Sequence, residues 1–216
     1  MELRFRNWNE ISVNTFKKLQ EVQINQTDEL ELLDANVRIL ALLCDVDEDV
    51  IGDLTKSEFQ RLLNQTAFLK EMPKAKINDK YVVNGNKYNV HLKLQEMSIS
   101  QYIDFQTFCK EKEKNIAEII ACFLIPKGKK YGDGYNIGDV VNDIGEYMSI
   151  VDAYSIMFFF TLLFQSLTKA MLTYSIRQMK KAKKKLSKEE QEKIDLAIEE
   201  TKRAMTLVEN GYGYTL

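Results

Sequence analysis

Apolar residues recur at helical spacing along most of the chain. Over residues 11–23 they stand three apart, at Val13, Phe16, Leu19 and Val22, which places them on one face of a helix. Similar spacing predicts further helices, which fall within residues 27–43, 55–69, 98–108, 115–124, 137–144, 149–185 and 187–208. The chain is therefore expected to be mainly helical.

Polar residues stand where several of these helices are expected to begin. Thr27 is expected to cap the second helix, because its hydroxyl can accept a hydrogen bond from a free backbone N–H. A capping box, in which Ser or Thr is followed three residues later by Glu or Gln, marks three further starts, at Thr55, Ser98 and Ser187. Capping chemistry and apolar spacing thus agree on where these helices begin.

Between residues 80 and 94 the helical period gives way to alternation. From Tyr88 to Leu94 every second residue is apolar, which is typical of a half-buried strand. The dipeptide Asn84-Gly85 precedes this run, and Asn and Gly tolerate the positive φ angles of a two-residue β-turn. We therefore predict one β-hairpin over residues 80–94.

These patterns predict a mainly α fold with one β-hairpin, a minor α+β character within a helical bundle. Residues 1–148 are expected to form a helical domain that contains the hairpin. Residues 149–216 are expected to form a helical hairpin, in which a long helix folds back on a shorter one and packs on the first part.

Composition and charge fit an ordinary folded chain. Of the 216 residues, 45% are hydrophobic and 29% are charged, and the formal net charge is −2. No overall charge therefore draws the chain to nucleic acid or to an anionic membrane. The first residues, MELRFRNWNEIS, lack the apolar core of a secretory signal. Cys44, Cys109 and Cys122 are widely spaced without a CxxC pair, so we expect reduced, buried thiols.

Candidate catalytic groups are few. His91 is the single histidine, so a Ser-His-Asp or Cys-His arrangement would have to use it. It stands on the polar side of the predicted hairpin, which favours an exposed strand residue over a catalytic one. One histidine and scattered cysteines do not match a zinc site. We therefore expect a protein that is not an enzyme and has no cofactor or metal.

Residues 126–136, PKGKKYGDGYN, are predicted to form a loop, because their proline and glycines interrupt helix and strand. The spacing matches neither a GxxxxGK[ST] phosphate-binding loop nor the alternating oxygen ligands of a calcium loop. Tyrosine among glycines suits a contact with another protein. We expect the loop to project from the helical body and to bind a partner through Lys127, Lys129, Lys130, Tyr131 and Tyr135.

The most apolar stretch, residues 153–167, has two interpretations. The interval between Asp152 and Lys169 is shorter than the roughly twenty apolar residues of a membrane span and includes polar side chains. A helix buried in a core or in an oligomer interface is therefore favoured. A membrane-associated helix stays open as an alternative, because the lysines that follow it fit the positive-inside pattern.

A strongly basic run follows the apolar stretch and consists of Arg177, Lys180, Lys181, Lys183, Lys184 and Lys185. Such a run can contact a phosphate backbone, which would make the chain a nucleic-acid-binding module. It can also be neutralised by the acidic residues 189–200, if the chain turns back near Leu186. Neutralisation or a solvated face is favoured, and nucleic acid stays open as a partner.

Three stretches of the first half carry a family resemblance. They are WNEISVNTF at residues 8–16, YVVNGNKYNVHLKL at residues 81–94, and ISQYIDFQTF at residues 99–108. With the order of segments, they resemble small structural and assembly proteins of tailed bacteriophages, in particular helical tail-assembly chaperones and small head-tail or tail proteins. The lysine-rich helical hairpin at the end has no counterpart in that resemblance.

The resemblance implies a non-enzymatic structural or assembly protein that works through protein–protein contacts. Its partners would be other phage structural proteins, and the chain would occur as a homo-oligomer or in several copies of one complex. Its location would be the virion, the host cytoplasm, or both.

Overall fold

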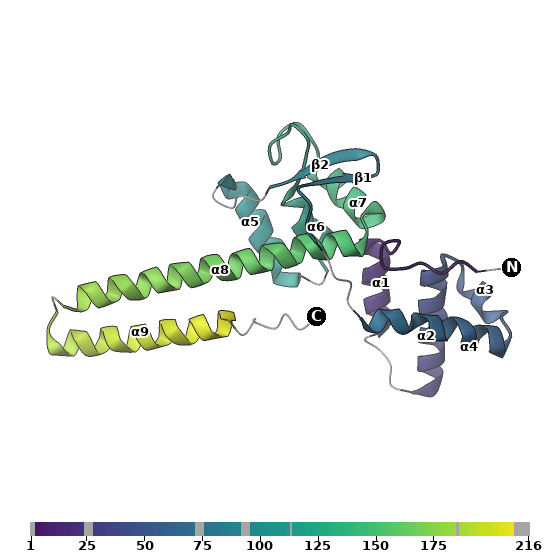
Figure 1. The fold of residues 1–216 in the computed structure, drawn as a ribbon, viewed down its shortest axis with the longest axis horizontal. Helices are drawn as coiled ribbons and strands as arrows, with labels where there is room; N and C mark the ends of the chain where they lie inside the picture. The colour runs from purple at the N-terminus through teal and green to yellow at the C-terminus, as the bar shows by residue number, and fades with distance from the viewer. Residues whose placement is uncertain are drawn as a thin grey trace. The chain divides into compact units, whose positions relative to one another are not determined.

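The computed structural model describes residues 3–23, 28–71, 76–91, 96–112, 114–184 and 186–209. These residues are mostly helical and include a small antiparallel sheet, so the expected mainly α fold with a β-hairpin is confirmed (Figure 1). The chain divides into two compact units, Met1–Met157 and Phe158–Leu216.

The first unit begins with a helical subdomain. Its elements are α1 (Val13–Gln23), α2 (Glu29–Cys44), α3 (Glu48–Gly52), α4 (Lys56–Gln65) and the 3-10 helix η1 (Thr66–Lys70). A core of Leu40, Ala41, Ile51 and Leu62 joins α2, α3 and α4. Burying such side chains contributes about 1.5–3 kcal/mol each, so this core holds the short helices in place.

The helix starts follow the capping chemistry with one correction. Thr55 and Ser98 form the predicted capping boxes, with their hydroxyls accepting from the backbone N–H of Glu58 and Gln101. The cap of α2 is Asp28, whose carboxylate accepts from Leu30 and Glu31 N–H at 2.9 Å. Thr27, the predicted cap, lies outside the described residues. An ionised carboxylate suits a helix N-terminus better than a neutral hydroxyl.

The predicted hairpin is confirmed, with shorter strands. β1 (Lys80–Val83) and β2 (Asn86–Val90) pair antiparallel, and Asn84 and Gly85 form the turn with φ angles of 50° and 75°. Positive φ at both central positions matches the right-handed twist of the strands. His91 lies just beyond β2, and residues 92–94 of the predicted hairpin lie outside the described part of the chain.

A third strand, β3 (Leu124–Pro126), was not predicted. It pairs antiparallel with β2, with Val90 opposite Leu124. The sequence placed Leu124 at the end of a helix, but that helix, α6 (Ile116–Ala121), ends earlier. Leu124 is fully buried in the sheet. Its pairing partner is distant in sequence, so neighbouring residues carried no signal for the strand.

Helices α5 (Ile99–Phe108), α6 and α7 (Ile137–Tyr147) complete the first unit, with a 3-10 helix η3 (Cys109–Glu111) after α5. Helices α6 and α7 pack together and contact the sheet (Figure 1). The buried Gln101 side chain donates a 2.6 Å hydrogen bond to the carbonyl of Cys122, and Phe105 packs edge-on against Phe123. These contacts attach α5 to the segment that leads into β3.

The long helix α8 (Ile150–Lys183) begins inside the first unit. Its first backbone N–H, from Ile150, donates to the carbonyl of Ile11 at 2.8 Å. One turn on, the Ser155 and Tyr81 hydroxyls share a buried 2.9 Å hydrogen bond. Because these contacts hold the first two turns of α8, the unit boundary falls within the helix, later than the predicted division after residue 148.

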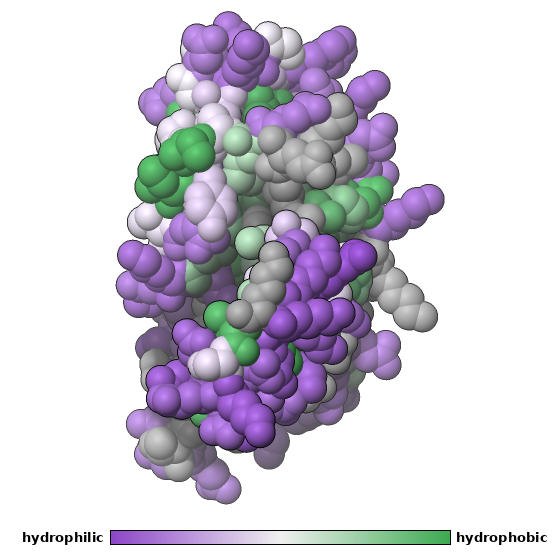
Figure 2. All heavy atoms as spheres, turned by 90° about the vertical axis from the view of Figure 1, so that its left-hand side faces the viewer, coloured by the Kyte–Doolittle hydropathy of each residue, from purple (hydrophilic) through white to green (hydrophobic). Residues whose placement is uncertain are grey.

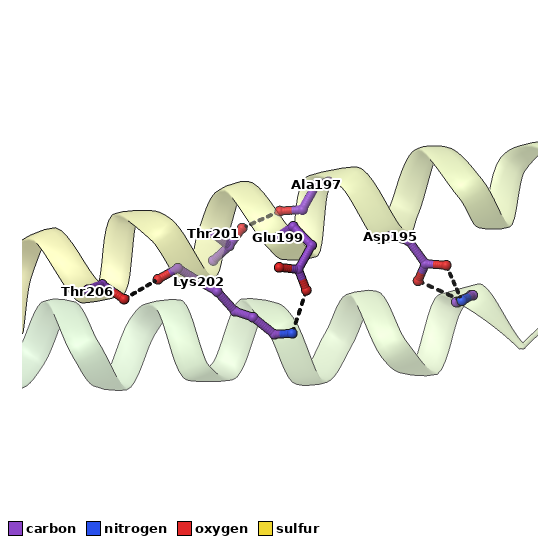
Figure 3. A network of polar contacts seen from close by, with 7 residues as sticks. Asp195, Ala197, Glu199, Thr201, Lys202 and Thr206 are labelled. Carbon is purple, nitrogen blue, oxygen red and sulfur yellow. Dashed lines mark hydrogen bonds and ion pairs between the residues drawn. The ribbon is translucent and has the colours of Figure 1, made fainter.

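In the second unit, α8 and α9 (Lys188–Glu209) lie side by side and antiparallel (Figures 1 and 3). One half of the predicted capping box is present, because the backbone N–H and the hydroxyl of Ser187 donate to the carboxylate of Glu190. Less exposed positions recur at spacings of three and four on both helices, which is coiled-coil spacing. On α8 they are Leu172, Ile176, Met179 and Lys183, and on α9 they are Gln191, Ile194, Ile198 and Thr201.

The apolar stretch 153–167 lies within α8. Ala153, Tyr154 and Ile156 are buried, whereas Phe158 and Leu162 are exposed. Within the described residues, no helix combines the length and the apolar character that crossing a membrane requires.

Candidate functional site

Two open hollows of the first unit are each lined by residues of the sheet and of the loop 126–136. The loop leaves β3 at Pro126 and ends at Asn136, whose side chain caps α7 by accepting from Gly138 N–H at 2.9 Å. Backbone hydrogen bonds from Lys129 to Pro126 and from Asp133 to Lys130, each 3.0 Å, fold the loop into successive turns. Lys129 borders both hollows.

The three predicted contact lysines of this loop, Lys127, Lys129 and Lys130, are exposed. Their charges can therefore meet a ligand or a partner from solvent. No reactive role follows from this placement, because an exposed ammonium group keeps its water shell and makes a weak contact by itself.

The predicted contact tyrosines differ from the lysines. Tyr131 is half-buried, and its hydroxyl donates a 2.9 Å hydrogen bond to the carboxylate of Asp104 on α5. The Cys122 sulfur lies 3.9 Å from the hydroxyl oxygen of Tyr131. Burial raises the pKa of Tyr131, and the neighbouring Cys122 and Asp104 raise it further. Tyr131 thus ties the loop to its own unit, and a further contact of its exposed part with a partner stays a prediction.

Tyr135 is also half-buried rather than presented to solvent. Its hydroxyl oxygen is buried and has no partner in hydrogen-bond geometry among the described residues. Burial raises the pKa of Tyr135, and an imperfect contact with the Gly132 backbone lowers it by less. The three lysines of the loop are thus exposed and its two tyrosines are half-buried, and the binding of a partner by these residues stays a prediction.

The larger hollow, of about 620 Å³, contains groups of both charges. His91, Glu96, Lys129, Lys130, Tyr131 and Asp133 are among the residues that line it. His91 is half-buried, and its ring nitrogen lies 4.0 Å from the Glu96 carboxylate. His91, which was predicted to be an exposed strand residue, therefore lies beyond β2 and at the edge of this hollow. Among the described residues, no group of three metal-ligating side chains was found.

The smaller hollow, of about 570 Å³, contains a carboxylate that the sequence did not single out. Asp143 on α7 accepts hydrogen bonds from Asn84 at 2.9 Å, Asn86 at 2.8 Å and the Tyr88 hydroxyl at 2.7 Å. Burial disfavours its ionised form, but the three hydrogen bonds outweigh burial and lower the pKa of Asp143. The carboxylate thereby holds the tip of the hairpin on α7.

The second candidate surface is the basic run on α8. Lys183 contacts both carboxylate oxygens of Asp195 on α9 at 2.6 Å, an ion pair that Figure 3 shows next to the turn. The other described members, Arg177, Lys180, Lys181 and Lys184, are exposed. Lys185 lies outside the described residues. The predicted internal neutralisation therefore applies to Lys183, and no ion pair was found for the other four described members of the run.

Comparison of the chain with protein-family models, curated proteins and solved structures found no match. The resemblance to tailed-bacteriophage proteins therefore stays a prediction.

Proposed function

We propose that this protein is a non-enzymatic structural or assembly component that works through contacts with other proteins. The observation that carries this proposal is an exposed apolar face on α5. Ile99, Tyr102 and Ile103 keep 76%, 47% and 56% of their surface accessible. They stand at positions i, i+3 and i+4, so their side chains share one face of the helix.

The opposite side of α5 is already used for packing. Phe105 and Gln101 are buried there, and they contact Phe123 and the carbonyl of Cys122. Helix α5 is thus apolar on both its inner and its outer face. Exposed apolar side chains that gather on one helix face are typical of a surface that another protein covers.

The polar groups near the two hollows also support contact rather than chemistry. Asp143 accepts from three side chains of the hairpin, and Asp104 accepts from Tyr131. These hydrogen bonds hold the hairpin and the loop in shape. A rigid hairpin and loop beside α5 suit a protein whose surface must fit a partner.

The biological setting that we propose is the virion of a tailed bacteriophage or its assembly in the host cytoplasm. This part rests on the sequence resemblance of residues 8–16, 81–94 and 99–108. The last of these stretches coincides with α5, whose outer face carries the exposed apolar residues. The partners would be other phage structural proteins or further copies of this chain.

Light scattering coupled to size exclusion tests this function. The full-length protein is measured alone at several concentrations, and then mixed with each protein encoded by the neighbouring genes of its source genome. The proposal expects a mass above that of one chain in at least one of these samples. A monomer at every concentration that binds none of those proteins contradicts it.

A further inference from the structure

Four exposed cations near the end of α8 form one stripe. Arg177, Lys180 and Lys181 stand at positions i, i+3 and i+4 on one face of α8, and Lys184, the residue directly after the helix, continues this spacing at i+7. At a rise of 1.5 Å per residue, the stripe is about 10 Å long. Its face differs from that of Leu172, Ile176, Met179 and Lys183, which α9 covers.

The carboxylates of α9 do not neutralise this stripe, because several are engaged elsewhere. Glu189 pairs with Lys193 at 3.1 Å. Asp195 pairs with Lys183 at 2.6 Å, and Glu199 pairs with Lys202 at 2.6 Å (Figure 3). A fourth, Glu190, accepts from Ser187 and caps the helix. Four acidic side chains of α9 are thus engaged within the hairpin, and no ion pair was found between the described carboxylates and the stripe.

We propose that this stripe, Arg177, Lys180, Lys181 and Lys184, contacts the phosphate backbone of a nucleic acid. Four cations within about 10 Å match the close spacing of charge along a duplex, where each phosphate neutralised releases bound counterions. Arginine and lysine supply no base-specific pattern from such a stripe, so the contact would be independent of sequence.

Two neighbouring features favour this ligand. Tyr174 stands one turn before Arg177 on the same side of α8, and its side chain is exposed. A tyrosine ring at the end of a cationic groove or stripe can stack on an unpaired base. Figure 2 looks onto the end where α8 turns into α9, and hydrophilic side chains dominate the surface nearest the viewer. The stripe continues toward this end through Lys184.

A second copy of the chain fits the stripe less well. The complementary surface would be the acidic outer side of α9, but Glu189 and Glu199 there already pair with lysines of their own helix. Breaking those pairs would offset part of the attraction. In a nucleic acid, no cationic group of the same molecule pairs with the phosphates, so no such pair has to be broken.

Fluorescence anisotropy with the full-length protein tests the inference. Labelled duplex DNA of random sequence, and a single strand of equal length, are titrated at salt concentrations from 50 to 200 mM. Four phosphate contacts predict a slope of about −3.6 for log K against log salt with the duplex, or roughly a hundredfold loss of affinity over this range. The single strand should give a slope of about −2.8.

The decisive variant changes Arg177, Lys180, Lys181 and Lys184 to Gln, which keeps helix propensity nearly unchanged. A matched control changes Lys188, Lys193, Lys202 and Arg203 of α9 to Gln, which removes the same charge. We expect the stripe variant to bind at least tenfold more weakly and the control to bind within about twofold of wild type. Circular dichroism checks that both variants keep their helix content.

A third variant changes Lys180, Lys181 and Lys184 to Arg and so keeps the charge of the stripe. It should keep its affinity for DNA, and it provides a test if the Gln variant unfolds. Equal weakening by the two Gln variants would overturn the inference, since net charge alone would then explain binding. It is also overturned if neither DNA form binds at 50 mM salt. Stripe-dependent binding to anionic vesicles, or stripe-dependent self-association, in place of DNA binding would overturn it as well.

Discussion

The hydroxyl of Tyr88 on β2 donates a 2.7 Å hydrogen bond to the carboxylate of Asp143 on α7. The two residues lie far apart in the sequence, and the contact joins the hairpin to the helix that follows the loop 126–136. Burial and this hydrogen bond together raise the pKa of Tyr88. The pair therefore determines how the smaller hollow is shaped.

Changing Asp143 to Ala should destabilise the first unit. The buried Tyr88 and the exposed Asn84 and Asn86 would lose their shared charged acceptor, a loss of about 2 kcal/mol. The melting temperature should fall by roughly 4–8 °C. The control is Asn142 to Ala, an exposed position on the same helix, which should stay within about 1 °C. Equal melting temperatures of the two variants would show that the hydrogen bonds of Asp143 do not stabilise the first unit.

The same carboxylate predicts a pH dependence. The pKa of Asp143 is lower in the folded chain than in the unfolded chain, where it is about 3.9. Its stabilisation is therefore complete above that value and is lost as the pH falls through the folded pKa. Urea unfolding of wild type and of Asp143→Asn from pH 7 to pH 3 measures this. The difference between them should be constant down to about pH 4 and shrink below it. A difference that does not change with pH would contradict the assignment.

Replacing Tyr131 by Phe tests whether the loop 126–136 packs on its own unit. The change removes the hydroxyl that donates to Asp104, and it should cost about 1 kcal/mol of unfolding free energy. Lys130→Ala, one residue earlier and exposed, should cost less than about 0.5 kcal/mol. Chemical denaturation measures both. If Tyr131→Phe leaves the unfolding free energy unchanged, the hydroxyl does not hold the loop on its own unit, and contact with a partner would be its remaining role.

Two residues of α9 that stand two positions apart allow a matched test of the helical hairpin. Ile198 is 5% exposed and Leu196 is 67% exposed. Truncating Ile198 to Ala should cost about 2–4 kcal/mol and speed hydrogen exchange of α9 amides. Truncating Leu196 to Ala should change exchange little. If both variants exchange alike, α9 is not held through the face that carries Ile198.

The features that the sequence predicted correctly depend on residues that stand close together in the chain. The capping boxes at Thr55 and Ser98 form as expected, Ser187 donates to Glu190, and Asn84-Gly85 makes the turn of the hairpin. In each case the interacting groups lie within four residues of one another, so the local pattern contains the whole interaction.

The sequence did not predict contacts between distant residues. β3 depends on pairing with β2, and Leu124 therefore looked like the end of a helix. Asp143 and Asp104 are single acidic residues with no pattern around them, and their donors come from other elements. Tyr131 and Tyr135 looked exposed because the glycines and lysines around them are polar, although their rings fold inward.

We propose that another protein covers the outer face of α5, and one comparison of masses tests this most directly. The variant changes Ile99, Tyr102 and Ile103 to Ser, and the control changes Val82 and Tyr147, which are also exposed and apolar, to Ser. Both should keep the helix content of wild type. Light scattering then compares wild type, variant and control, each alone and with the proteins encoded by neighbouring genes. The account predicts an assembled species for wild type and control and a single chain for the α5 variant. An α5 variant that assembles to the same mass as wild type would contradict it.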